Sequence, residues 1–157
     1  MPLKLFGSLC LLMAGTLAAH TCARYEKQKL SVLDAWITLI DTIREEIDCY
    51  LLPLDEILAL IDRTLILDCM CTKTAPSLED LLRSSLLYLE PEAKRLISSF
   101  VREIGKSNRE EQVRRCSYYV TGLQNVRERM KGELSGKIRV GSTISLGIAA
   151  AVTILLW

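Results

Sequence analysis

Hydrophobic residues recur every three or four positions through the middle of the chain, a spacing that places them on one face of an α-helix. The first run predicts a long helix that is interrupted at Pro53, because proline cannot continue a helix. The second run predicts one further helix, which fades in the polar stretch at residues 72–75. The apolar positions of the two runs are Leu30, Leu33, Ile37, Ile40, Ile43 and Ile47, followed by Leu54, Ile57, Leu58, Ile61 and Leu65.

Capping signals predict where the next two helices begin. Ser77 followed by Asp80 has the form of a capping box, with aspartate in place of the usual glutamate, and it opens a helix that carries apolar residues as far as Leu89. Pro91 fits the first position of the following helix, which is predicted to stop at Gly105. No alternating run of β-branched and aromatic residues is present, so no strand is predicted.

The start of the last helix has two possible forms. Either Ser107 to Glu110 forms a second capping box, or Asn108 alone caps the helix. The helices counted in this way number five or six, and they predict an all-α fold, a compact antiparallel bundle. The apolar positions of the last helix are Val113, Cys116, Val120, Leu123, Val126, Met130 and Leu134.

Two uncharged stretches flank the bundle, the nineteen residues 5–23 and the eighteen residues 140–157. Both are close to the length that a helix needs to cross a bilayer. We therefore predict an N-terminal transmembrane helix (1–23), a helical bundle (24–137) and a C-terminal transmembrane helix (138–157). Basic residues flank both spans on the bundle side, which places the bundle in the cytoplasm. They are Arg24, Lys27 and Lys29 at the first span and Lys131, Lys137 and Arg139 at the second.

A cleaved signal peptide is the alternative for the first uncharged stretch. Lys4 precedes an apolar core, and Ala18 and Ala19 offer small residues for cleavage. The protein would then be exported, cysteine-rich and anchored at its C-terminal end. The basic residues before Val140 would then lie outside the cytoplasm and break the positive-inside pattern, which disfavours this alternative.

The side-chain chemistry points to binding and away from catalysis. The net charge is only +1 and charges alternate along the middle segment, so no nucleic-acid-binding face is expected. No Cys-x-x-Cys pair and no Gly-rich phosphate loop occurs, and the single histidine, His20, lies in an apolar stretch. We therefore predict no catalytic, cofactor-binding or metal-ligating residue and no small-molecule substrate. Free thiols are expected at Cys49, Cys69, Cys71 and Cys116.

Several segments share a pattern that extends in order over nearly the whole chain: Leu3 to Gly7, Glu46-Ile47, Pro53-Leu54, Glu56 to Leu58, Ile104-Gly105 with Asn108 and Gln112, and the final span with Gly141 and Gly147. Together these segments resemble the stage III sporulation protein AB family. Cys49, Leu52 and Asn108 depart from the family's usual tyrosine, threonine and aspartate.

The resemblance implies a role in endospore formation. Proteins of this family belong to the membrane complex that the mother cell builds at the engulfed forespore, which also contains an ATPase. Their soluble domain is similar to the cytoplasmic domain of type II secretion F proteins. The resemblance thus implies a non-enzymatic assembly subunit on the mother-cell side of the forespore membrane, which couples the ATPase to the membrane machine through helix faces. Its partner surface is expected near Glu46, Glu56, Asn108 and Gln112.

Overall fold

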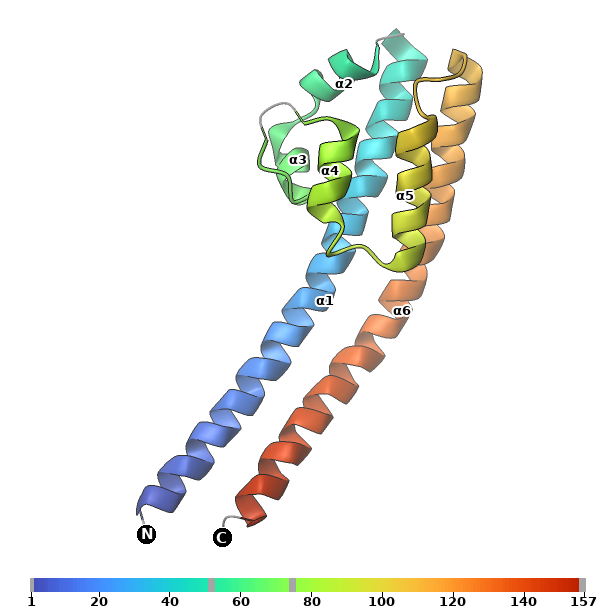
Figure 1. Cartoon of the computed structure of the whole chain (residues 1–157). Coiled ribbons are helices and arrows are strands. Elements are labelled where there is room, and N and C mark those ends of the chain that lie inside the picture. The colour runs from blue at the N-terminus through green and yellow to red at the C-terminus, as the bar shows by residue number, and fades with distance from the viewer. Residues whose placement is uncertain (1, 51–52, 74–75, 156–157) are drawn as a thin grey trace. The chain divides into compact units, whose positions relative to one another are not determined.

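The computed structural model describes residues 2–50, 53–73 and 76–155. These residues form only helices and turns, which confirms the all-α prediction (Figure 1). The helices are α1 (Pro2–Tyr50), α2 (Leu54–Leu60), α3 (Arg63–Asp68), α4 (Leu78–Ser85), α5 (Pro91–Glu103) and α6 (Arg109–Leu155).

The chain divides into two compact units. One is the bundle Lys29–Arg129, and the other consists of the two ends, Met1–Gln28 and Met130–Trp157. The long helices α1 and α6 each contribute to both units. Within the described residues, no helix combines the length and the apolar character that a membrane crossing requires. The two predicted transmembrane helices are therefore not confirmed.

One broad apolar face of α1 forms the centre of the bundle. Trp36 and Ile40 are fully buried there, while Leu30 and Ile37, which the periodicity placed in the core, are only half-buried. The buried face is wider than a strict three-four ladder because helices pack on α1 from two sides (Figure 1). Its buried residues are Val32, Leu33, Ala35, Trp36, Leu39, Ile40, Ile43 and Ile47.

A buried hydrogen bond joins α1 to α4. Nε1 of Trp36 donates to Oγ of Ser85 at 2.9 Å, and the Ser85 hydroxyl lies 2.9 Å from the carbonyl oxygen of Leu81, to which it can donate. Both side chains are fully buried. Because each polar atom has a partner, the pair can be buried without the cost of an unsatisfied group.

The prediction of a single helix from Leu54 to Leu65 is wrong. The helix stops at Leu60, because Ile61 has an extended backbone (φ −61°, ψ 137°), and α3 starts after Asp62. The carboxylate of Asp62 accepts a hydrogen bond from the backbone N–H of Thr64 at 3.1 Å. A capping aspartate thus begins a second short helix at a new angle, while Ile57 and Ile61 remain buried.

The end of α3 contains the one non-glycine residue with a positive φ among the described residues, Met70 (φ 63°). The N–H of Met70 donates to Leu67 O at 2.8 Å, and the N–H of Cys71 donates to Ile66 O at 3.1 Å. These two bonds define a Schellman turn, in which glycine usually occupies the left-handed position. The turn reverses the chain so that Cys69 and Cys71 are both buried.

The predicted starts of α4 and α5 are confirmed, but the end predicted for α4 is not. Ser77 and Asp80 form the reciprocal capping box. The helix ends at Ser85, and a turn follows in which the N–H of Tyr88 donates to Ser85 O, so Leu89 is buried outside the helix. Pro91 occupies the first turn of α5, after an extended residue, as the proline ring requires.

Helix α6 runs antiparallel to α1 within the bundle. Arg127 pairs with Asp34, and Arg109 pairs with Asp48, so the sequence number rises along one helix as it falls along the other. These four side chains are between 31% and 58% exposed. Each pair therefore contributes at most about 1 kcal/mol to the stability of the fold and mainly sets the register of the two helices.

Helices α5 and α6 pack through aromatic rings. Phe100 meets Tyr119 edge to face, with ring centroids 5.7 Å apart, and the Tyr119 hydroxyl lies 2.9 Å from the carboxylate of Glu103. Arg115 pairs with the same carboxylate at 3.1 Å. Burial is the main cause that raises the pKa of Tyr119, to about 12, and its bond to Glu103 adds to it, so the phenol remains protonated at neutral pH.

Candidate partner-binding surface

The turn before α6 contains two of the residues expected at a partner surface. Oδ1 of Asn108 accepts from the N–H of Glu111 at 3.0 Å, so Asn108 caps the helix, and the alternative box from Ser107 to Glu110 is excluded because Glu110 is the second helical residue. Gln112 spans the same turn: its Nε2 donates to Ser107 O at 2.6 Å and its Oε1 accepts from the Gly105 N–H at 3.3 Å.

The turn itself depends on glycine, since Gly105 has a φ of +81° and a side chain there would be strained. The bonds of Asn108 and Gln112 hold this turn in one conformation. Both residues therefore have a structural role, and a binding role for them stays a prediction. The sequence gives one indication of this role. Gln112 comes four residues after the cap, and from that position a long side chain can reach back over the turn.

Replacing the cap tests this structural role. We expect Asn108→Ala to lower the free energy of unfolding by about 1 kcal/mol, because the N–H of Glu111 loses its acceptor. Asn108→Asp should keep the stability, since a carboxylate caps equally well and favours the helix N-terminus. Urea unfolding followed by circular dichroism measures both. An alanine variant as stable as the wild type would show that water replaces the cap.

An ion pair brings this turn to the end of α1. Nη2 of Arg109 lies 2.8 Å from Oδ1 of Asp48 and also donates to the Asp48 carbonyl oxygen. This carbonyl belongs to the last turn of α1, where backbone oxygens have no partner within the helix. The C-terminal end of α1 and the N-terminal end of α6 thus form one end of the bundle.

Glu46 and Glu56 are located differently. Glu46 is half-buried near the end of α1, and Glu56 is exposed in the first turn of α2. Neither carboxylate makes a hydrogen bond or an ion pair with the residues that the structure describes. No described contact joins them to Asn108 or Gln112. The junction between them includes residues 51 and 52, so Leu52, which departs from the family's usual threonine, lies outside the described residues.

The basic residues expected beside the second span lie on α6. Lys131 is half-buried. For Lys137 and Arg139 the structure describes the helical backbone, and their side chains are outside the described part.

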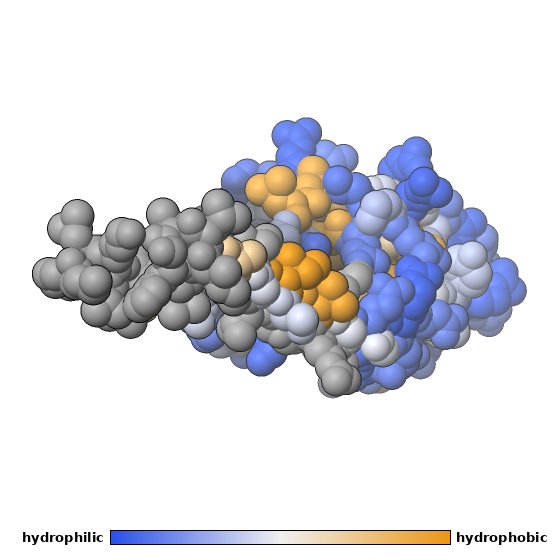
Figure 2. Space-filling model, turned by 90° about the horizontal axis from the view of Figure 1, so that it is seen from below, coloured by the Kyte–Doolittle hydropathy of each residue, from blue (hydrophilic) through white to orange (hydrophobic). Residues whose placement is uncertain are grey.

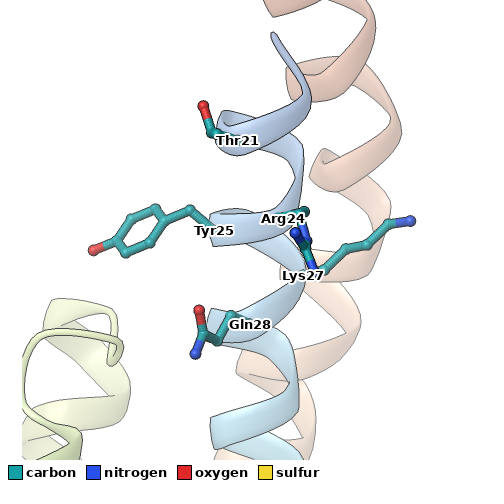
Figure 3. A pocket seen from close by; sticks show the side chains of 5 residues that line it. All are labelled: Thr21, Arg24, Tyr25, Lys27 and Gln28. Carbon is teal, nitrogen blue, oxygen red and sulfur yellow. The ribbon is translucent and has the colours of Figure 1, made fainter. Parts of the chain in front are cut away.

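A pocket of about 620 Å³ on α1 is lined by Arg24 and Lys27 with neutral polar side chains (Figure 3). Thr21, Tyr25 and Gln28 point to one side of the helix, and Lys27 points to the other. Because the charged and aromatic groups diverge, the pocket does not present a converging set of donors to one anion.

A surface that was not expected from the sequence lies between α2 and the start of α4. Asp55, Leu58, Ala59, Pro76 and Ser77 line an open groove of about 230 Å³. In the view of Figure 2, most of the coloured surface is hydrophilic and hydrophobic residues form small groups. The groove combines apolar walls with a carboxylate at its edge, which suits a protein partner better than a small polar substrate.

The thiols of the bundle fall into exposed and buried sets. Cys49 is exposed, whereas Cys69, Cys71 and Cys116 are buried, and all four are free. Burial raises the pKa of Cys69 to about 12 and that of Cys116 to about 11. Among the described residues, no group of three or more potential metal ligands gathers.

Alkylation at pH 8 should separate these sets. Cys49 should react at the rate of an exposed thiol, and Cys69 and Cys116 at least about a hundredfold more slowly, because the thiolate is the nucleophile and a raised pKa removes it. Mass spectrometry of the peptides gives each rate. The difference should disappear in concentrated urea. Equal rates in the native protein would contradict the buried placement.

The family model of stage III sporulation protein AB matches residues 4–157. The chain belongs to this family. Membership places its role in stage III of sporulation. No curated protein and no solved structure matches the chain.

Family membership confirms the resemblance inferred from the sequence, and the structure assigns positions to its segments. Ile104 and Gly105 end α5 and form the turn that Gln112 closes, Asn108 caps α6, and Pro53 directly precedes α2. The family is one of sporulation assembly proteins and is not a known enzyme family.

Proposed function

We propose that the protein is a non-enzymatic assembly subunit of the membrane complex between mother cell and forespore. In this role it couples the ATPase of that complex to its membrane parts through contacts of helix faces. The match to the stage III sporulation protein AB family over residues 4–157 carries the proposal. The unpaired carboxylates of Glu46 and Glu56, on either side of Pro53, support a docking surface at this end of the bundle.

Membrane attachment is part of the same proposal. Residues 5–23 and 140–155 are helical and uncharged, and basic residues follow the first stretch and precede the second. A helix of this kind would place its basic flank on the cytoplasmic side. The bundle would then face the mother-cell cytoplasm, where the partners that include the ATPase are expected.

The test is a charge reversal at the two unpaired carboxylates. We expect Glu46→Lys combined with Glu56→Lys to block spore formation while the protein stays folded and in the membrane fraction. Reversing the charge of a negatively charged docking surface should repel its partner. The fold should not change, because neither carboxylate forms an ion pair or hydrogen bond with the described residues of the bundle. Heat-resistant spore counts, circular dichroism and membrane fractionation are the measurements.

A control adds positive charge elsewhere on the bundle. Ser31→Lys with Thr38→Lys places two lysines on the exposed stripe of α1, and sporulation should be normal. Normal sporulation with the reversed pair as well would show that Glu46 and Glu56 are not at the docking surface.

A further inference from the structure

The net charge of the chain is only +1 because two strongly charged segments of opposite sign nearly cancel. Between Glu45 and Asp80 there are nine acidic and two basic residues, a formal charge of −7. Between Lys94 and Lys131 there are ten basic and four acidic residues, a formal charge of +6. The prediction that charges alternate along the bundle is therefore wrong on the scale of whole helices. The first of these segments is acidic and the second is basic.

The residues that line the groove all belong to the acidic segment. Asp55, Leu58 and Ala59 of α2 line it together with Pro76 and Ser77, which precede α4. Leu60 on α2 and Leu67 on α3 are 69% and 47% exposed. Both leucines add exposed apolar area to the segment that lines the groove.

The acids around this groove are not neutralised within the bundle. Of the two basic residues in the segment, Lys73 is bound to Asp80 at 2.6 Å, which leaves Arg63. Asp55, Glu56 and Glu79 form no ion pair with the described residues. A partner that fills the groove must therefore present positive charge around an apolar contact.

The chain itself carries a surface of that kind on α5 and α6. Arg95 and Arg102 are seven residues apart on α5, so they share a face, and both are exposed without an ion pair to the described residues. On α6, Arg114 and Tyr118 are four residues apart and share an exposed face. Tyr118 is 67% exposed and supplies the apolar contact.

The two surfaces belong to different helices. Helices α2 and α3 lie to one side of α1, and α5 and α6 lie to the other (Figure 1). A symmetric contact of two acidic grooves would bring like charges together, and a symmetric contact of two basic faces would do the same. The attractive arrangement is the one in which the groove of one molecule meets the basic face of the next.

We propose that a second copy of this chain docks on the α2 groove, with the α5–α6 face around Arg114 and Tyr118 as its contact surface. The contact joins two different surfaces, so each associated pair leaves one groove and one basic face open for further copies. It requires no other protein, and it therefore stands or fails separately from the proposed sporulation partners. Because charges carry the attraction, association should weaken as salt rises.

The test uses two variants of the full chain in a nonionic detergent. Asp55→Asn with Glu56→Gln neutralises the groove edge, and Arg114→Gln with Tyr118→Ser removes the contact of the basic face. The wild type should associate as concentration rises at about 50 mM salt and dissociate at about 500 mM salt. Each variant alone should stay a monomer, since it lacks one of the two surfaces. Light scattering after size exclusion gives the masses.

The decisive arm is a one-to-one mixture of the two variants. Each retains the surface that the other lacks, so the mixture should form a dimer of one molecule of each, and nothing larger. Ser31→Lys with Thr38→Lys changes the net charge by the same +2 as the groove variant and should associate like the wild type. A monomeric wild type at low salt, a groove variant that still dimerises alone, or a mixture that stays monomeric would each overturn the proposal.

Discussion

Replacing Trp36 by alanine should lower the free energy of unfolding by about 3–5 kcal/mol, the usual cost of removing a large buried ring. Trp36 is fully buried on the central face of α1, so the lost side chain leaves a cavity that the surrounding helices can only partly fill. The change also leaves the Ser85 hydroxyl without its donor. Urea unfolding followed by far-ultraviolet circular dichroism measures the loss.

Two matched variants separate packing from hydrogen bonding at this site. Ser85→Ala keeps the ring but leaves the buried Nε1 of Trp36 without an acceptor, which should cost about 1–3 kcal/mol. Trp36→Phe removes the donor and keeps much of the volume. If Trp36→Ala unfolds at the same urea concentration as the wild type, α4 does not pack on α1 as described.

A second large loss is expected for Phe100→Ala, again about 3–5 kcal/mol. Phe100 is 1% exposed and meets Tyr119 edge to face, so the variant loses both its buried area and an aromatic pair. Phe100→Leu should cost less, because leucine fills most of the space without the ring contact. Thermal and urea unfolding give the differences.

The control for this prediction is an exposed apolar residue. Leu87 is 81% exposed in the turn after α4, and Leu87→Ala should change the stability by no more than about 0.5 kcal/mol. A similar loss for Phe100→Ala and Leu87→Ala would show that the α5–α6 contact does not stabilise the bundle.

Local sequence signals predicted several helix boundaries, because each depends on a few adjacent residues. The Ser77 box, Pro91 and the glycine after α5 all act within one turn of the helix, and each appears where the sequence placed it. The break at Asp62 was missed. An aspartate inside an apolar run reads as a solvent-facing position, and it is recognised as a cap only when the burial of Ile61 fixes an extended backbone before it.

The width of the buried face of α1 could not be predicted from the sequence either. Trp36 lies one position before the apolar ladder at Ile37, and which of the two is buried depends on where α4 packs on α1. This is a tertiary property that helical periodicity does not contain. The charge separation between the α2–α3 segment and the α5–α6 segment was visible in the sequence, but averaging over the chain concealed it.

The sequence predicted that Gln112 lies in the first turn of α6, but it did not predict the hydrogen bonds of its side chain. Its side chain bonds depend on the conformation of the turn at Gly105, which the sequence only suggests through glycine. The same limit applies to Glu46 and Glu56, whose lack of partners is evident only once the packing of α1 and α2 is known.

Helices capped by a carboxylate should respond to acid differently from α6, which is capped by an amide. The Asp80 carboxylate completes the capping box of α4, and its pKa is lowered first by the hydrogen bond from Lys73 and then by the Ser77 N–H. A lowered pKa stabilises the fold above the ordinary aspartate value near 4, and this contribution is lost as the pH falls through the folded value. The amide of Asn108 does not titrate, so the start of α6 keeps its cap. Asp62, the cap of α3, also has a lowered pKa, because it accepts the hydrogen bond from the Thr64 N–H. In strong acid the bundle should therefore open first at the starts of α3 and α4, while α6 stays helical at its N-terminal end.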